Sequence, residues 1–206
     1  PLTKILNGKG REVFALNFSG HGGEPFSEKG FGIEIFADDI IRFLNNQQLS
    51  KVDVFGYSMG GYVALWCAHL YPDRVGHIVT LGTKFDWDVA SAAKETTKLN
   101  IDKLVEKVPA FVRLLEHRHE PNSWKELINK TISMMTGLGN QPRLTLNRFE
   151  KIRNTCTILL GEDDDMADRS FSKTVARTLP NAQFHLLPAT PHPIEKVDLL
   201  TLASFI

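Results

Sequence analysis

Gly56-Tyr57-Ser58-Met59-Gly60-Gly61 is the stretch that decides the fold, because it joins two segments of opposite character. The apolar run Val52-Asp53-Val54-Phe55 ends just before it, and a helical pattern from Tyr62 to Leu70 starts directly after it. This order predicts a strand, a tight turn and a helix. A serine between two glycines at such a turn adopts a strained backbone that pushes its hydroxyl out of the chain. Ser58 is therefore the candidate nucleophile.

The residues after Ser58 have two expected roles. Gly60 and Gly61 are expected to let the helix begin close to the sheet, and the Met59 amide is expected to face a ligand. The alternative reading is an ordinary glycine-rich connection between a strand and a helix. The residues in the other loops of the chain distinguish a nucleophile turn from an ordinary connection.

Composition limits the class of protein. The chain has 206 residues, of which 42% are hydrophobic, and no internal repeat, so one sizeable core is expected. Lys and Arg number 24 and so do Asp and Glu, which favours a small-molecule partner over nucleic acid or a membrane surface. Cys67 and Cys156 are expected to be reduced and buried. No apolar run approaches the length of a membrane span, so a cytoplasmic location is expected, while the oligomeric state stays undetermined.

Apolar runs and helical patterns alternate through most of the chain. Helical periodicity marks residues 1–10 and the stretch from Ile33 to Leu44. Strands alternating with helices predict an α/β fold, a mostly parallel sheet with helices on both faces. The runs that predict strands are Val13–Phe18, Val52–Phe55, His77–Gly82, Cys156–Leu160 and Ala182–Leu187.

Residues 85–151 interrupt this alternation. They contain helical stretches, Val89–Val108 and Trp124–Met135, separated by Pro109, Pro121 and Gly137–Gly139. We interpret the segment as a helical cap inserted into a core formed by residues 1–84 and 152–206. Large aromatic and methionine side chains are candidates for a substrate pocket, with plain core packing as the alternative. These candidates are Tyr57, Trp87, Phe111, Trp124, Met134 and Met135.

Two further loops carry the groups that a serine nucleophile needs. A serine hydroxyl requires a base within hydrogen-bond reach, and that base requires a third group to fix its tautomer. Asp163, Asp164 and Asp165 follow one predicted strand, and His192 lies in the loop after the last one. In a parallel sheet these loops fall at the same carboxyl edge as Ser58. We expect no metal and no organic cofactor in such a site.

These features together resemble the α/β-hydrolase superfamily, of the serine hydrolase type with a helical cap. The resemblance runs from Ser19-Gly20-His21-Gly22 to the end of the chain. The family usually has its acid three residues after the glycine that closes the penultimate strand, which implies Asp164 after Gly161. Asp163 and Asp165 stay as alternatives, and members that carry the acid one strand earlier would use Asp86.

The resemblance also implies the base. The family histidine opens the last loop before the final helix, as in His192-Pro193-Ile194-Glu195, although Pro191 replaces the usual preceding glycine. The Met59 amide is implied as one half of an oxyanion hole. The family's second donor precedes the first helix, and a further strand lies between those at Val13–Phe18 and Val52–Phe55. We therefore expect roughly 40–60 natural residues before Pro1.

The leading hypothesis is a serine hydrolase that cleaves an ester, thioester or related acyl bond of a small molecule through an acyl-enzyme. Ser58 is expected to attack, His192 to move the proton, and Asp164 to orient the histidine. A carbon–carbon hydrolase, a lyase or an acyltransferase can use the same triad, because the pocket and not the triad selects the leaving group. A ligand-binding member of the fold without activity is the alternative from another class.

Overall fold

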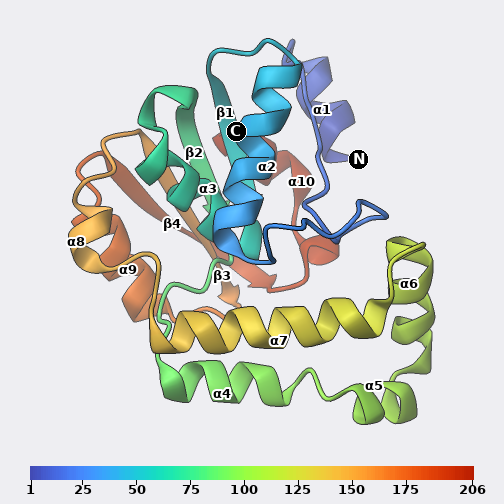
Figure 1. The fold of residues 1–206 in the computed structure, drawn as a ribbon. Helices are drawn as coiled ribbons and strands as arrows, with labels where there is room; N and C mark the ends of the chain where they lie inside the picture. Colours follow the sequence, from blue (N-terminus) through green and yellow to red (C-terminus); the bar gives the residue numbers. More distant parts are fainter. The chain divides into compact units, whose positions relative to one another are not determined.

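The computed structural model describes residues 1–206, which form two compact units (Figure 1). The sheet unit comprises Pro1–Ala15, Leu44–Asp86 and Leu144–Ile206. The helical unit comprises Leu16–Phe43 and Trp87–Arg143. This division differs from the expected core and cap, because residues 16–43 group with the insertion and residues 144–151 with the sheet. The role of the insertion as a lid stays a prediction.

The sheet unit contains four parallel strands in the order β1-β2-β3-β4. Their register pairs Tyr57 with Leu81, Leu81 with Leu159 and Leu159 with His185. Such a register brings the carboxyl ends of the strands to one edge, where the predicted site residues follow them. The predicted α/β class with a parallel sheet is thus confirmed. The strands are β1 Val52–Tyr57, β2 Val75–Leu81, β3 Cys156–Asp163 and β4 Ala182–Pro191.

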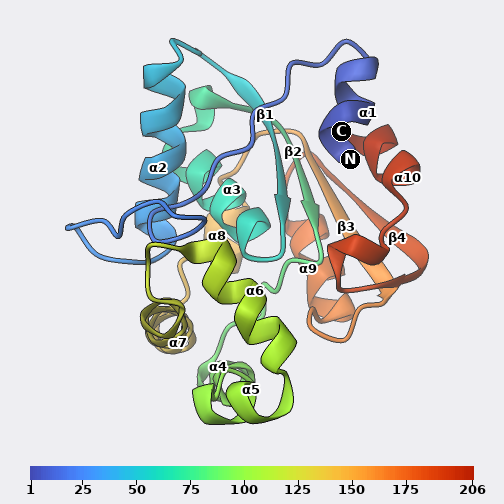
Figure 2. The same ribbon diagram turned by 90° about the vertical axis from the view of Figure 1, so that its right-hand side faces the viewer.

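Helices cover both faces of this sheet (Figure 2). Alternate residues of β2 point to opposite faces, as the period of two in a strand requires. Val79 and Leu81 pack with Leu202 of α10 in one buried cluster, whereas Thr80 lies against Gly61 of α3 on the other face. The helices of this unit are α1 Leu2–Gly8, α3 Met59–Leu70, η1 Pro72–Arg74, α8 Leu146–Phe149, α9 Arg169–Thr178, η2 Ile194–Lys196 and α10 Leu199–Phe205.

One predicted strand is absent. Residues 11–18 form no strand, and Phe14 is 41% exposed. A strand requires a neighbour that pairs its N–H and C=O groups, and β1 pairs only with β2 in this structure. The prediction of a strand at Val13–Phe18 is therefore wrong for this structure. The expectation of further residues before Pro1 stays a prediction.

The end of the chain also differs from its sequence pattern. We expected the last strand to end at Leu187, but β4 continues to Pro191 because, beyond an irregularity in the register, Asp163 pairs with Pro191. His192 consequently follows the strand directly. Residues 194–206 form a short 3₁₀ turn followed by α10, since the Asp198 carboxylate accepts a hydrogen bond from the Thr201 amide and starts the helix there.

The helical unit holds four consecutive helices of the insertion, together with most of α2. The predicted helix over 89–108 is divided in two, because the Asn100 side chain accepts a hydrogen bond from the Lys103 amide and starts a new helix. Gly137–Gly139 was expected to break the last helix, which instead runs through it. A Cβ on Gly139 would lie 2.5 Å from the Ala92 Cβ, so this glycine allows α4 and α7 to pack closely. The bounds are α2 Ile33–Asn46, α4 Val89–Thr97, α5 Ile101–Lys107, α6 Pro109–His119 and α7 Trp124–Asn140.

None of the helices in either unit is long and apolar enough to cross a membrane.

A buried histidine fastens the loop around Gly22 to the end of α6. His119 is 7% exposed, and its Nδ1 accepts a hydrogen bond of 3.0 Å from the Gly22 amide. Its ring also lies 5.9 Å from the ring of His21. Burial lowers the pKa of His119, and the nearby His21 and Arg118 lower it further. The Nδ1 atom has to be unprotonated to accept from Gly22, so the contact exists only in the neutral form of His119.

Burial also lowers the pKa of His21, although the Ser19 carbonyl and the Asp39 carboxylate oppose this effect. Both histidines are thus neutral in the fold and bind protons more readily in the unfolded chain. For a group whose pKa falls on folding, the stabilisation is present above the unfolded value of about 6.5 and is lost as the pH falls below it.

We expect the melting temperature of the protein to fall as the pH decreases from about 8 to about 5, with part of this slope due to His119. His119→Asn should flatten the slope, because an amide oxygen can accept from Gly22 and does not titrate. Thermal unfolding at several pH values measures this. His117→Asn, at an exposed position of the same helix, is the control. Equal slopes in wild type and His119→Asn would contradict the assignment.

Candidate active site

Ser58 occupies the turn between β1 and α3 in a conformation that few residues adopt. Its φ is 52° and its ψ is −118°, at the N-cap position of α3. Such a backbone costs a non-glycine residue on the order of 1–3 kcal/mol. The Ser58 side chain makes no capping hydrogen bond to the helix, so its hydroxyl is not used to start α3. The strained turn predicted around this serine is present.

Two glycines permit this turn, and they are not both the expected ones. A Cβ on Gly56 would lie 2.4 Å from the backbone of Gly60, and a Cβ on Gly61 would lie 2.1 Å from the Thr83 Oγ1. Real Cβ atoms do not approach so closely, so these positions allow α3 to begin against the sheet. Gly60 has open space around it. The close approach expected of Gly60 and Gly61 therefore belongs to Gly56 and Gly61.

The end of β2 holds the backbone of Ser58 in place. The Ser58 amide donates a hydrogen bond of 2.8 Å to the Leu81 carbonyl. Thr83, which is only 1% exposed, donates from its hydroxyl to the Ser58 carbonyl over 3.0 Å. Hydrogen bonds at both ends of one residue offset the cost of its strained conformation.

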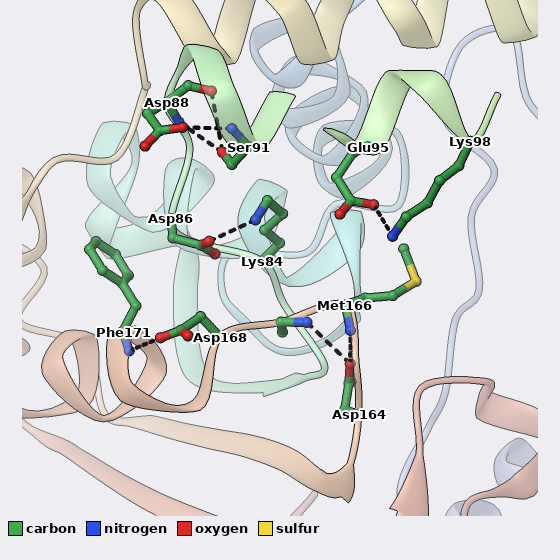
Figure 3. A network of polar contacts seen from close by, with 11 residues as sticks. Lys84, Asp86, Asp88, Ser91, Glu95, Lys98, Asp164, Met166, Asp168 and Phe171 are labelled. Carbon is green, nitrogen blue, oxygen red and sulfur yellow. Dashed lines mark hydrogen bonds and ion pairs between the residues drawn. The ribbon is translucent and has the colours of Figure 1, made fainter. Parts of the chain in front are cut away.

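His192 and Asp164 form a closely paired acid and base. The Asp164 Oδ2 lies 2.8 Å from the His192 Nδ1, and their side chains are 2% and 10% exposed. The Asp164 Oδ1 accepts hydrogen bonds of 2.9 and 3.2 Å from the amides of Met166 and Ala167 (Figure 3). Burial raises the pKa of Asp164, but the bonds from His192, Met166 and Ala167 outweigh it and hold the pKa below its ordinary value. Asp164 therefore stays ionised at neutral pH.

The other candidate acids lie elsewhere. Asp163 and Asp165 are exposed, and Asp86 forms an ion pair of 2.7 Å with Lys84 (Figure 3). Among these four aspartates only Asp164 is bonded to His192. With its Nδ1 bonded to Asp164, the imidazole has its Nε2 for exchanging a proton with a nucleophile. The Ser58 hydroxyl makes no hydrogen bond to His192 in this structure, as is common in enzymes without substrate.

Gly82 lies between the nucleophile turn and the acid–base pair. It follows Leu81, which binds the Ser58 amide, and its φ is +60°. A Cβ there would lie 2.8 Å from the Asp164 Oδ2 and 3.2 Å from the His192 Nδ1. A glycine is thus required both by its φ and by the approach of the two side chains. The segment Leu81–Thr83 therefore contacts both the backbone of Ser58 and the Asp164–His192 pair.

The remaining predicted site residues have different surroundings. Met59 is the first residue of α3, so the hydrogen-bond ladder of the helix does not use its amide. The Tyr57 hydroxyl donates to the His192 carbonyl over 3.0 Å. Within the helical unit, Trp124 packs with Val112 and Ile128 in a buried cluster. Phe111 is 46% exposed, and Trp87, Met134 and Met135 are partly exposed. Whether any of them contacts a substrate stays a prediction.

Gly82 and Thr83 were not among the residues predicted from the sequence. The available signal was a glycine at the end of a predicted strand, followed by a small hydroxyl residue. Positive φ and close side-chain approach are both common reasons for a glycine at that place. The hydrogen bond from the Tyr57 hydroxyl to the His192 carbonyl had no sequence signal, because the two residues are 135 positions apart.

Comparison with known proteins identifies the family of the chain. The family model of the alpha/beta hydrolase fold matches residues 2–114, more than half of the chain. The chain belongs to the α/β-hydrolase family. Proteins similar to this chain include a depolymerase and a hydrolase, which are described next.

Three relatives show how far the similarity extends. A Bacillus subtilis (strain 168) protein, provisionally named 2-succinyl-6-hydroxy-2,4-cyclohexadiene-1-carboxylate synthase, is 27% identical, over 88% of this chain and 74% of its own length. A poly(3-hydroxyalkanoate) depolymerase of Ectopseudomonas oleovorans is 24% identical, over 85% of this chain and 67% of its own. The solved structure of a mutant meta-cleavage product hydrolase from Pseudomonas fluorescens IP01 has a TM-score of 0.69 at 19% identity, covering 99% of this chain and 82% of that one.

Gly82→Ala should reduce hydrolytic turnover by about 100-fold, because the new methyl group would displace His192 and Asp164 by a fraction of an ångström or more. Gly10→Ala is the matched control. Its φ is +79° and nothing lies within 4 Å of the added Cβ, so it introduces the same kind of backbone strain without crowding. Turnover and melting temperature are compared for both. Equal effects on turnover would show that crowding at Gly82 is unimportant.

Proposed function

We propose that this chain is a serine hydrolase that cleaves an ester, thioester or related acyl bond of a small molecule. Ser58 is the nucleophile, His192 the general base and acid, and Asp164 the group that orients His192. The observation that supports the proposal is that one segment, Leu81–Thr83, contacts both the strained Ser58 backbone and the Asp164–His192 pair. A strained serine and a buried acid–base pair at one sheet edge are the parts that acyl transfer requires.

The reaction follows from these positions. As the Ser58 Oγ attacks the acyl carbon, the His192 Nε2 takes the hydroxyl proton and the carbonyl electrons move to the oxygen. The Met59 amide is placed to donate to that oxygen. Collapse of the intermediate breaks the bond to the leaving group, which receives the proton from His192. Water then attacks the acyl carbon while His192 accepts one of its protons. The bond to the Ser58 Oγ breaks, this oxygen receives the proton from His192, and the carboxylic acid leaves.

The names of the relatives support hydrolysis of an acyl bond and also suggest a second candidate. Similar proteins are named as a depolymerase and a methyl ester esterase, and others as a synthase and a meta-cleavage product hydrolase, so more than one reaction occurs among them. The same triad serves both, since the pocket selects the bond. Assays with a panel of acyl-chain esters and thioesters, and with a vinylogous 1,5-diketone, separate the two.

A fluorophosphonate probe should label the wild-type protein on the peptide that contains Ser58. Ser58→Ala should abolish this labelling, because a phosphonate reacts only with an activated serine. Ser204, a serine of α10 outside the site, provides the control variant Ser204→Ala, which should label like the wild type. A silent wild type would favour a ligand-binding protein without activity.

Among the acidic residues, Asp164→Asn should cause the greatest loss of turnover, on the order of ten-thousandfold, because an amide favours the wrong tautomer of the histidine. Asp163→Asn and Asp165→Asn, at exposed neighbouring positions, should have little effect. Steady-state kinetics of the purified variants measure the three losses. A comparable loss in Asp86→Asn with an active Asp164→Asn would reassign the acid.

We further propose that residues 85–151 form a lid that selects the substrate. The segment is inserted between β2 and β3, the strands whose carboxyl ends lead to Gly82 and Asp164. Its helices α5 and α6, and the residue between them, carry exposed apolar side chains, which favour contact with an apolar group. These residues are Val105, Val108, Phe111 and Leu114.

If this segment is a lid, Phe111→Ala should change the ratio of kcat/KM between long-chain and short-chain esters by about tenfold. Labelling of Ser58 by a small fluorophosphonate should stay unchanged. Leu200→Ala removes an apolar side chain of α10 that is even more exposed than Phe111, and it should leave the ratio unaltered. An unchanged ratio in Phe111→Ala, together with a lowered melting temperature, would mean that the helix serves only for stability.

A further inference from the structure

The proposed base and the proposed nucleophile come from strands that are not neighbours. Ser58 follows β1 and His192 follows β4, and β2 and β3 lie between them in the sheet. The bond between Asp164 and His192 ties the base to β3 only. A separate interaction is needed to fix the distance from the base to Ser58, and proton transfer is sensitive to that distance.

Tyr57 supplies such an interaction. Its hydroxyl donates a hydrogen bond of 3.0 Å to the backbone carbonyl of His192, 135 residues further along the chain. Its ring lies 5.2 Å from the imidazole, between centroids. Tyr57 also precedes Ser58 directly, and the bond between the Ser58 amide and the Leu81 carbonyl holds this part of the chain. One side chain therefore joins the nucleophile turn to the loop that carries the base.

The surroundings of Tyr57 keep it in this position. The ring packs with Ile194 against the buried cluster that includes Leu81 and Val197. Burial raises the pKa of Tyr57, and the carboxylates of Glu195 and Asp164 raise it as well, although a hydrogen bond from the Ile194 backbone opposes them. The phenol therefore keeps its proton near neutral pH and can act as a donor.

We propose that Tyr57 is a positioning residue that sets the placement of His192 relative to Ser58. This inference rests on the proposed function. Tyr57 acts through a backbone carbonyl and touches no reacting atom. The sequence predicted that Tyr57 lines a substrate pocket. Replacing a pocket residue changes KM for the substrate, whereas replacing a residue that positions the base changes kcat. The two roles are therefore separable by kinetics.

Tyr57→Phe is the decisive variant, because it removes the hydroxyl and leaves the ring in its packing. We expect kcat for a chromogenic ester to fall about tenfold, the effect of one lost hydrogen bond. KM should stay within about twofold, and the rate at which a small fluorophosphonate labels Ser58 should fall in parallel with kcat. A role in packing alone would change neither rate.

Tyr62→Phe is the matched control. Tyr62 is buried in the same unit, and its hydroxyl accepts a hydrogen bond of 2.8 Å from the Leu144 amide. Removing it should lower the melting temperature and leave kcat unchanged. All rates are expressed per reactive Ser58, counted by exhaustive labelling well below the melting temperature, so that a less stable Tyr57→Phe still gives an interpretable result.

The outcomes separate this inference from the proposed function. If the wild type is not labelled at Ser58, the proposed function fails. If the wild type is labelled and Tyr57→Phe matches it in kcat and labelling rate, the positioning role is overturned while the function stands. An increase in KM with unchanged kcat would also overturn it and assign Tyr57 to the substrate pocket instead.

Discussion

Contacts from the end of β2 hold the strained backbone of Ser58, and the geometry of the candidate site depends on them. A residue with φ of 52° and ψ of −118° is stable only where its neighbours hold it on both sides. The Leu81 carbonyl and the Thr83 hydroxyl provide those contacts. Gly56 and Gly61 have no Cβ, which would otherwise clash with the neighbouring chain at these positions. The parallel order of β1 and β2 is what brings these groups together. The nucleophile turn is thus a product of the sheet and not of its local sequence alone.

The same edge of the sheet explains how groups far apart in sequence form one site. The aligned carboxyl ends of β2, β3 and β4 lead to Gly82, Asp164 and His192 in turn. Gly82 has no side chain and a positive φ, so the acid and base can lie against its backbone beside the Ser58 turn. The Tyr57 hydroxyl then joins the end of β1, next to Ser58, to the backbone of His192 after β4. β1 and β4 are not neighbours in the sheet, so the backbone at Gly82 and the side chain of Tyr57 connect the groups that follow them.

Much of this arrangement could be predicted from the sequence, because apolar period and turn residues are local signals. The four strands, the turn at Ser58 and the loops of Asp164 and His192 were all visible in that way, and the pairing of Asp164 with His192 agrees with the acid chosen there. The strand expected at Val13–Phe18 was not found, because pairing depends on a neighbour that local pattern does not reveal. The uninterrupted α7 depends similarly on the packing of Gly139 against α4. Gly82, Thr83 and the hydroxyl of Tyr57 act through contacts between distant segments, which composition and spacing cannot show.

Trapping the acyl-enzyme is the most direct test of the proposed acyl transfer to Ser58. The wild-type protein is mixed with an activated ester, quenched in acid during the first turnover, and examined by intact mass and peptide mapping. We expect one acyl group per chain on the peptide that contains Ser58, formed together with one equivalent of released alcohol. Turnover of the ester without any acylated protein, or an acyl group on a residue other than Ser58, would contradict it.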